Sequence, residues 1–324
     1  MATAIEFKLP TEEQKALVRQ KVGTTEQDIR QAVSSLRSWL LAQPHLPHLI
    51  DDGRLERMYI SCKCSIEKSK KMLDAYYTLK NRFPELLLNR DPLGDDVQDI
   101  IKYVTLVIMP RLTEDGHRVT CLTDICPDAT NMEMFMVSKL KLMATEYILS
   151  FDYSIGYIIV MDMKNLSAAH VMKIGVRDIR ALETIVRRAY SRRIVTVHLI
   201  NAPKVIDMLL SIVYPAIPEK LRNRIHVHLP GSQELFKHVE RDLVPNEMGG
   251  TGGASRDLMG DCALPDLVAL WRITESHLCS GSSYIRRIDL KRWPHGSDGS
   301  TQGLVQGRRQ TRSGRNQKTS RQPV

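Results

Sequence analysis

The sequence lacks the features of a membrane-spanning or secreted protein. In its 324 residues no apolar stretch reaches the roughly 18 residues that mark a membrane-spanning helix. The first residues, MATAIEFKLPTEEQK, do not contain the apolar core of a signal peptide. From these two absences we expect a cytoplasmic protein.

Cysteine is sparse and badly spaced for a structural role. None of the six cysteines belongs to the paired C-x-x-C spacing of a zinc site, and six are few for the disulfide scaffold of a secreted protein. We therefore expect reduced thiols, no bound metal and no cofactor. The cysteines are Cys62, Cys64, Cys121, Cys126, Cys262 and Cys279.

Signatures of catalysis are also missing. The glycine run 249–253 lacks the Lys-Ser/Thr of a phosphate-binding loop, which favours a flexible linker there. Neither a G-x-S-x-G element nor a zinc-protease helix is present. His226 and His228 lie on one face of a predicted strand, but no third ligand follows at a recognisable spacing, so we expect a structural role. We expect no catalytic residues and no enzyme.

The net charge of +9 comes mostly from one end of the chain. Residues 299–324 contain six cations and no acid, which leaves +3 for the other 298 residues. Residues 294–324 are rich in Gly, Ser, Gln and Arg, so we expect a disordered basic tail. Such a tail is compatible with RNA, anionic lipid or no partner. Because no aromatic side chain is present there to stack on a base, we expect no specific nucleic acid.

The rest of the chain alternates helical and strand patterns. Helices are predicted at 11–22, 25–42, 54–61, 65–82, 131–149, 175–190 and 264–278, and strands at 104–109, 118–122, 156–162, 194–200 and 225–229. Thr11 and Thr25 are the predicted caps of the first two helices. Strands alternating with helices in the second half favour an α/β fold with parallel strand pairs.

The stretch from 194 to 229 is the most unusual. After the strand, Asn201 and Pro203 favour the start of a helix that is apolar around most of its circumference, with only Asp207 and Ser211 strongly polar between 205 and 217. Its 13 residues, about 20 Å of helix, are too few for a membrane span. A short basic turn and a second strand follow.

Several segments resemble the CRAL-TRIO lipid-binding family, in the branch of the tocopherol-transfer and retinaldehyde-binding proteins. They are KMLDAYYTLKNRFPELLLNRDP, GYIIVMDM, HLINAP, EKLRNRIHVH and LVPNEMGG, in that order, and the resemblance covers roughly residues 10–260. It implies an all-α N-terminal domain (1–92) and a CRAL-TRIO domain (93–255) with a mixed, largely parallel sheet as floor and helices as wall and lid. A C-terminal helical extension (256–293) and the tail (294–324) would follow.

The resemblance also implies a ligand pocket. A stripe of methionines at 132–143, with Met161 and Met163, is by itself more typical of core packing than of a pocket, and the resemblance shifts the interpretation toward a pocket. Lys139 departs from the pattern, and either reaches outward or contacts a polar ligand group. The implied wall residues are Met136, Leu142, Met143, Tyr157, Met161, Leu182, Ile185, Val186 and Val197, and the implied lid residues are Ile206, Leu209, Leu210 and Val213.

Three basic residues occupy positions that form a phosphoinositide-binding groove in relatives, namely Arg193, Lys220 and Arg224. Lys220 and Arg224 are four apart, so a helical turn would bring them together. A solvated basic face is the alternative. The chain carries Ile60 where relatives carry an arginine that helps to hold the headgroup, which weakens the expected selectivity.

From the resemblance we expect a non-enzymatic, monomeric, intracellular carrier of one small hydrophobic ligand, such as tocopherol, a retinoid or a related lipid. The helix at 203–217 would open at membranes that contain phosphoinositide and so associate the protein with them transiently. The alternative is a regulatory or scaffold protein of the same fold that acts through protein partners.

Overall fold

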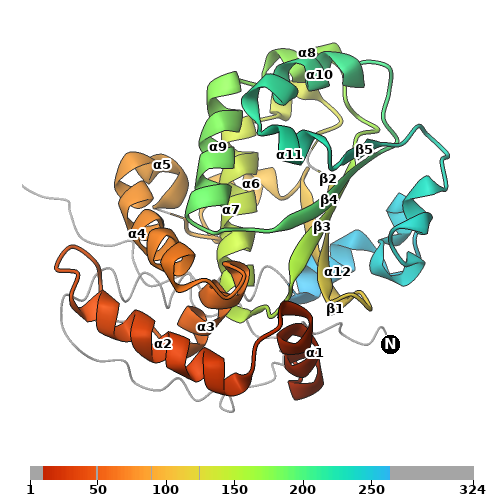
Figure 1. Ribbon diagram of the computed structural model, residues 1–324. Coiled ribbons are helices and arrows are strands. Elements are labelled where there is room, and N and C mark those ends of the chain that lie inside the picture. The colour runs from red at the N-terminus through yellow and green to blue at the C-terminus, as the bar shows by residue number, and fades with distance from the viewer. Residues whose placement is uncertain (1–9, 49, 89, 124, 263–324) are drawn as a thin grey trace, which may run out of the picture. The chain divides into compact units, whose positions relative to one another are not determined.

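A computed structural model describes residues 10–48, 50–88, 90–123 and 125–262 (Figure 1). The predicted helix at 264–278, most of the extension at 256–293 and the tail at 294–324 lie outside the described residues.

The N-terminal part is helical because its apolar residues recur at helical spacing behind well-defined caps. Thr11 and Thr25 each accept a hydrogen bond from the backbone N–H three residues later, as predicted, and each belongs to a capping box. Side chains such as Leu36, Leu55 and Met72 are buried between these helices. The helices are α1 (Glu12–Val22), α2 (Glu26–Leu41), α3 (Asp52–Ser61), α4 (Ile66–Arg82) and α5 (Pro84–Leu87).

A mixed, largely parallel sheet follows, which confirms the predicted fold class. Its strands lie in sequence order, with β1 and β2 antiparallel and the other neighbours parallel. The strands are β1 (Thr105–Leu112), β2 (His117–Thr123), β3 (Gly156–Asp162), β4 (Ile194–Ile200) and β5 (Ile225–Val227).

The two faces of the sheet are covered by different parts of the chain (Figure 1). One face packs against α7 (Met134–Phe151) and α10 (Ile206–Val213), with α9 (Val176–Arg188) beside α7. The opposite face, with Val119, Cys121 and Val160, packs against the segment that ends in α12 (Ser255–Cys262). The short helices are α6 (Asp95–Ile100), α8 (Ala168–Met172), α11 (Glu219–Arg222), η1 (Ala129–Asn131), η2 (Tyr214–Ala216), η3 (Glu234–Lys237), η4 (Arg241–Leu243) and η5 (Asn246–Met248).

Two local predictions need correction. The helix expected over 205–217 is α-helical only to Val213, where the chain tightens into η2 around Pro215. The glycine run 249–253 is a packed turn and not a flexible linker: Gly252 N–H donates to Val244 O at 2.9 Å, and a Cβ on Gly250 would lie 2.0 Å from that oxygen. Within the described ranges no helix is both long enough and apolar enough to cross a bilayer.

Candidate ligand-binding cavity

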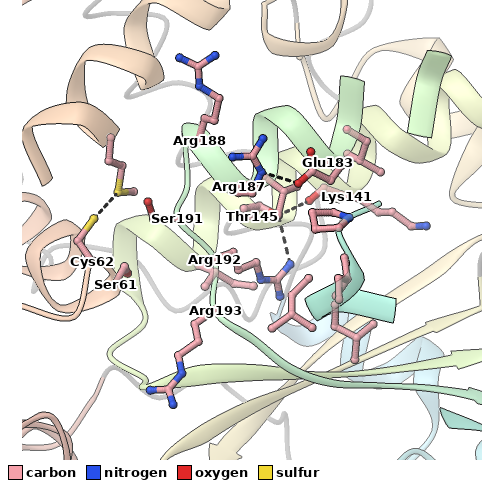
Figure 2. A pocket seen from close by; sticks show the side chains of 18 of the residues that line it. Ser61, Cys62, Lys141, Thr145, Glu183, Arg187, Arg188, Ser191, Arg192 and Arg193 are labelled. Carbon is pink, nitrogen blue, oxygen red and sulfur yellow. Dashed lines mark hydrogen bonds and ion pairs between the residues drawn. The ribbon is translucent and has the colours of Figure 1, made fainter. Parts of the chain in front are cut away.

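A cavity of about 1140 Å³ lies between the sheet, α7, α9 and the N-terminal helices. Part of its lining is shown in Figure 2. Most of the apolar lining comes from these elements, through Leu106, Leu122, Ile159, Met161, Ala144, Ile148, Ile179, Leu182, Val186, Trp39 and Met72.

The repeat of side-chain direction along a strand and along a helix explains which residues reach the cavity. Leu122 of β2 is the register partner of Met161 of β3, so both point to the same face of the pleated sheet. On α9, Ile179, Leu182 and Val186 are three and four residues apart and form one stripe along the helix. The cavity is therefore lined by one apolar face of the sheet and one stripe from each wall helix.

Cationic side chains outnumber acidic ones around this apolar lining. The acids are Glu67, Asp74 and Glu183, and each already has a side-chain partner: Glu183 pairs with Arg187 at 2.6 Å, Glu67 with Lys70 at 2.7 Å and Asp74 with His45 at 3.0 Å. The lining cations are Lys63, Lys68, Lys70, Lys71, Lys141, Arg187, Arg188, Arg192, Arg193, Lys220 and Arg224.

Four of these cations, Lys63, Arg193, Lys220 and Arg224, form what we call the basic cluster. Arg193 first and then Lys220 lower the pKa of Lys63, with smaller contributions from burial, Lys68 and Arg224, so Lys63 lies within electrostatic range of the other three cations. Lys63 lies in the α3–α4 loop and has a left-handed backbone, with φ of 56°. The basic cluster thus joins the N-terminal helices to the turn after α10.

The wall helix α7 is held against the N-terminal helices by a buried carboxylate. Glu146 accepts hydrogen bonds from Tyr76 Oη at 2.6 Å and Tyr190 Oη at 2.8 Å, and it pairs with Arg54 and Arg90. Burial by itself would raise the pKa of Glu146, but Arg54 and Arg90 outweigh it and hold that pKa well below its ordinary value. This network fixes one side of the cavity.

Comparison with known proteins agrees with this architecture. Residues 118–250 match the family model of the CRAL/TRIO domain, and residues 25–97 match that of a Pinta-like UBA domain. The chain carries a CRAL/TRIO domain. The family resemblance seen in the sequence is thereby confirmed.

Two curated relatives illustrate the similarity. The human alpha-tocopherol transfer protein-like protein is 24% identical over 228 residues, 68% of this chain and 65% of the relative, so the chain spans slightly less than two thirds of that protein. Clavesin-1 of Xenopus laevis is 24% identical over 251 residues, 73% of each chain. Among solved structures, Sfh5 has a TM-score of 0.47 and 14% identity over 83% of this chain and 99% of that chain, a likeness too weak to support an inference.

The structure places the residues expected in the pocket of the CRAL/TRIO domain in three environments. Met161, Leu182 and Val186 line the cavity. Leu142 and Ile185 are buried in the core shared with the N-terminal helices. The rest belong to the core between the sheet, α7 and α10 and do not line the cavity; they are Met136, Met143, Tyr157, Val197, Ile206 and Leu209, with Leu210 and Val213 partly buried against them.

Two residues that departed from the family pattern have clear surroundings. Lys139 is buried, and its Nζ lies 3.4 Å from Oδ2 of the half-exposed Asp96, away from the cavity lining. Ile60 is buried in the core of the N-terminal helices and does not reach the cavity. Neither side chain is placed to touch a ligand in this cavity.

The predicted histidine pair belongs to a larger stack on the other face of the sheet. His198 Nδ1 lies 2.9 Å from His228 Nε2, and the ring centroids of His226 and His238 lie 5.1 and 5.5 Å from that of His198. Burial, and then the neighbouring His228, lower the pKa of His198 to about 3, so its ring is neutral. Within the described residues no group of three or more His, Cys, Asp or Glu side chains is arranged to hold a metal.

Sequence reasoning placed Arg193, Lys220 and Arg224 together, and all three line the cavity. It missed Lys63 and Arg192. Two features of the sequence could have identified them: Arg192 is next to Arg193, and Lys63 begins a lysine-rich stretch.

Proposed function

We propose that this chain is a non-enzymatic carrier that binds one hydrophobic molecule in the cavity and exchanges it at a membrane surface. The observation that supports the proposal is the combination of a cavity of about 1140 Å³ with aliphatic walls and a basic cluster on the same lining. Ligand pockets are typically about 300–1000 Å³, so a lipid of ordinary size has room here.

The driving force would be burial of apolar ligand surface. Removing about 400 Å² of a hydrocarbon chain from water contributes about 10 kcal/mol before the entropy of association is subtracted. Met72 and Met161 are suited to this task because their unbranched side chains adapt to a flexible partner. Tocopherol, a retinoid and a fatty-acid-like chain would all suit such walls.

Phosphoinositide in the membrane is the proposed release signal. Each Lys or Arg near an anionic surface adds about 1 kcal/mol, which gives weak and salt-sensitive binding unless the cations converge on one headgroup. The lowered pKa of Lys63 supports such a convergence in the basic cluster, and a multiply phosphorylated group would relieve the repulsion that Lys63 feels there. Lys63 offers the positive charge from the N-terminal helices that Ile60 does not.

The proposed gate is the segment from α10 through α11. α10 does not line the cavity, whereas Ile217, Pro218 and Leu221, which follow it, do. Lys220 and Arg224 lie in the same segment, so capture of a headgroup there would bias the segment toward an open state. The gate thus extends further along the chain than the predicted lid at 203–217.

Cavity filling tests the carrier proposal. The full chain with Val186→Trp should lose binding of a fluorescent fatty-acid or retinoid analogue while it keeps its thermal stability. The matched control is Val176→Trp, which changes an exposed residue of the same helix outside the lining. Unchanged binding by a well-folded Val186→Trp protein would refute the cavity as the binding site.

Vesicle transfer tests the role of the basic cluster. Adding phosphatidylinositol bisphosphate to phosphatidylcholine vesicles should speed ligand transfer by wild type but not by Arg193→Glu, Lys220→Glu and Arg224→Glu combined. The control combines Lys15→Glu, Lys102→Glu and Lys237→Glu, which make the same charge change outside the cavity lining. Equal acceleration of all three proteins would show that the basic cluster is only a solvated face.

A further inference from the structure

Arg192 lines the cavity, and the carrier proposal does not yet use it. It follows α9 and precedes β4, directly after Ser191, whose φ of 44° turns the backbone into the left-handed region. Figure 2 shows that Arg192 and Arg193 diverge: the guanidinium of Arg192 reaches toward Thr145 on α7, and that of Arg193 points the opposite way. The two neighbours therefore serve different parts of the cavity.

The protein contacts of the Arg192 guanidinium are few. Its Nη1 donates to Thr145 Oγ1 at 3.3 Å, and its central carbon lies 4.2 Å from the centroid of the Tyr157 ring. Its Nε and Nη2 are buried from solvent and have no hydrogen-bond partner in the protein. These two nitrogens share one edge of the planar guanidinium, the edge with which arginine binds both oxygens of a carboxylate.

No carboxylate of the described chain neutralises this charge. The acid that acts on it most, Asp152, is occupied by Arg118 at 2.6 Å and by Ser154 Oγ at 2.8 Å. Burial accordingly lowers the pKa of Arg192. Since a buried ion without a counterion is strongly disfavoured, the empty edge calls for an anion supplied from outside the chain.

We infer that the ligand is an acidic amphiphile whose carboxylate pairs with the guanidinium of Arg192 at the cavity wall, where a rotation of that side chain brings Nε and Nη2 within reach. This inference rests on the proposed carrier function and specifies its ligand class. The hydrocarbon chain of such a ligand would lie along Leu182, Val186 and Ile159, which share the lining with Arg192.

The geometry favours a carboxylate over the other polar ends that an apolar cavity could take. A single hydroxyl, as in an alcohol or a phenol, has one oxygen and would leave one of the two N–H groups unsatisfied. An ester or hydrocarbon would leave the positive charge unpaired. A multiply charged phosphate matches the several cations of the basic cluster better than it matches one guanidinium.

The experiment compares three ligands that differ only at the polar end: oleate, oleyl alcohol and methyl oleate. Each displaces the neutral dye Nile red from the delipidated full chain at pH 7.4. Wild type should bind oleate about 10- to 100-fold more tightly than oleyl alcohol, the effect expected of a charge-assisted pair of hydrogen bonds.

Arg192→Leu should bring that ratio of affinities close to one without weakening the binding of oleyl alcohol, and Arg192→Lys should restore part of the ratio. The control, Arg188→Leu, removes a lining arginine that points away from Arg192 (Figure 2) and should keep the ratio.

The outcomes separate this inference from the function on which it rests. Equal binding of oleate and oleyl alcohol by wild type, or an unchanged ratio in Arg192→Leu, overturns the assignment of Arg192 but leaves the carrier intact. Failure of all three ligands to displace the dye counts against the carrier itself. The wild-type comparison needs no variant, so it can overturn the inference even if Arg192→Leu does not fold, and the ratio in Arg192→Lys then tests the assignment to Arg192.

Discussion

Two neighbouring residues of α7, Thr145 and Glu146, lie beside two contrasting groups of buried arginine. Glu146 provides a carboxylate for Arg54 and Arg90 and accepts hydrogen bonds from two tyrosines. Thr145 gives Arg192 only a hydroxyl oxygen at 3.3 Å. In the first group each guanidinium faces a carboxylate of the chain, whereas in the second the guanidinium of Arg192 faces none. We interpret the first as part of the scaffold and the second as part of the binding site.

The largest expected effect comes from removing the carboxylate of Glu146. Glu146→Gln leaves two buried guanidinium groups without their carboxylate and should lower the free energy of unfolding by about 3–5 kcal/mol. Urea denaturation measures this loss. Asp99→Asn breaks the exposed pair with Lys102 and should cost less than about 1 kcal/mol. Equal losses in the two variants would show that Glu146 is not a structural anchor.

Acid should remove the same stabilisation. The pKa of Glu146 is lower in the folded chain than in the unfolded chain, so its contribution is complete above the unfolded pKa and is lost as the pH falls toward the folded one. Between pH 5 and pH 3 the stability difference between wild type and Glu146→Gln should shrink by about 1–2 kcal/mol. A difference that stays constant over this range would contradict the lowered pKa.

A smaller effect is expected from Arg192 in the ligand-free protein. Arg192→Leu removes a buried charge that has no counterion, so stability should change by no more than about 1 kcal/mol in either direction. Arg54→Leu removes one partner of Glu146 and should cost about 3 kcal/mol. Denaturation of the two delipidated variants side by side tests the contrast. If Arg192→Leu were as damaging as Arg54→Leu, Arg192 would belong to the scaffold.

Much of the fold could be predicted because it depends on local patterns. The β-branched run at 194–200 and the caps at Thr11 and Thr25 specify a strand and two helix starts without reference to distant residues. The glycine turn at 249–253 could not be recognised, because its conformation depends on backbone oxygens of residues 241–245. Spacing within the run contains no information about that contact.

The cavity residues were harder to predict for the same reason. Leu182, Ile185 and Val186 are all apolar and lie within two turns of α9, yet Leu182 and Val186 line the cavity and Ile185 packs into the N-terminal core. Helical periodicity shows which residues share a stripe of the helix. It does not show whether that stripe packs against another element or lines a cavity. Whether Arg192 has a carboxylate partner depends on which carboxylates already bind other cations. The sequence contains no information about that.

The most direct test of the contrast is to observe both arginines in one spectrum. In protein labelled with ¹⁵N arginine, the Nε–H signals of Arg54 and Arg192 can be assigned from their absence in Arg54→Lys and Arg192→Lys. On addition of one equivalent of oleate, the Arg192 signal should shift strongly while the Arg54 signal stays in place. Bound oleate with an unmoved Arg192 signal, or with equal shifts of both signals, would contradict the account.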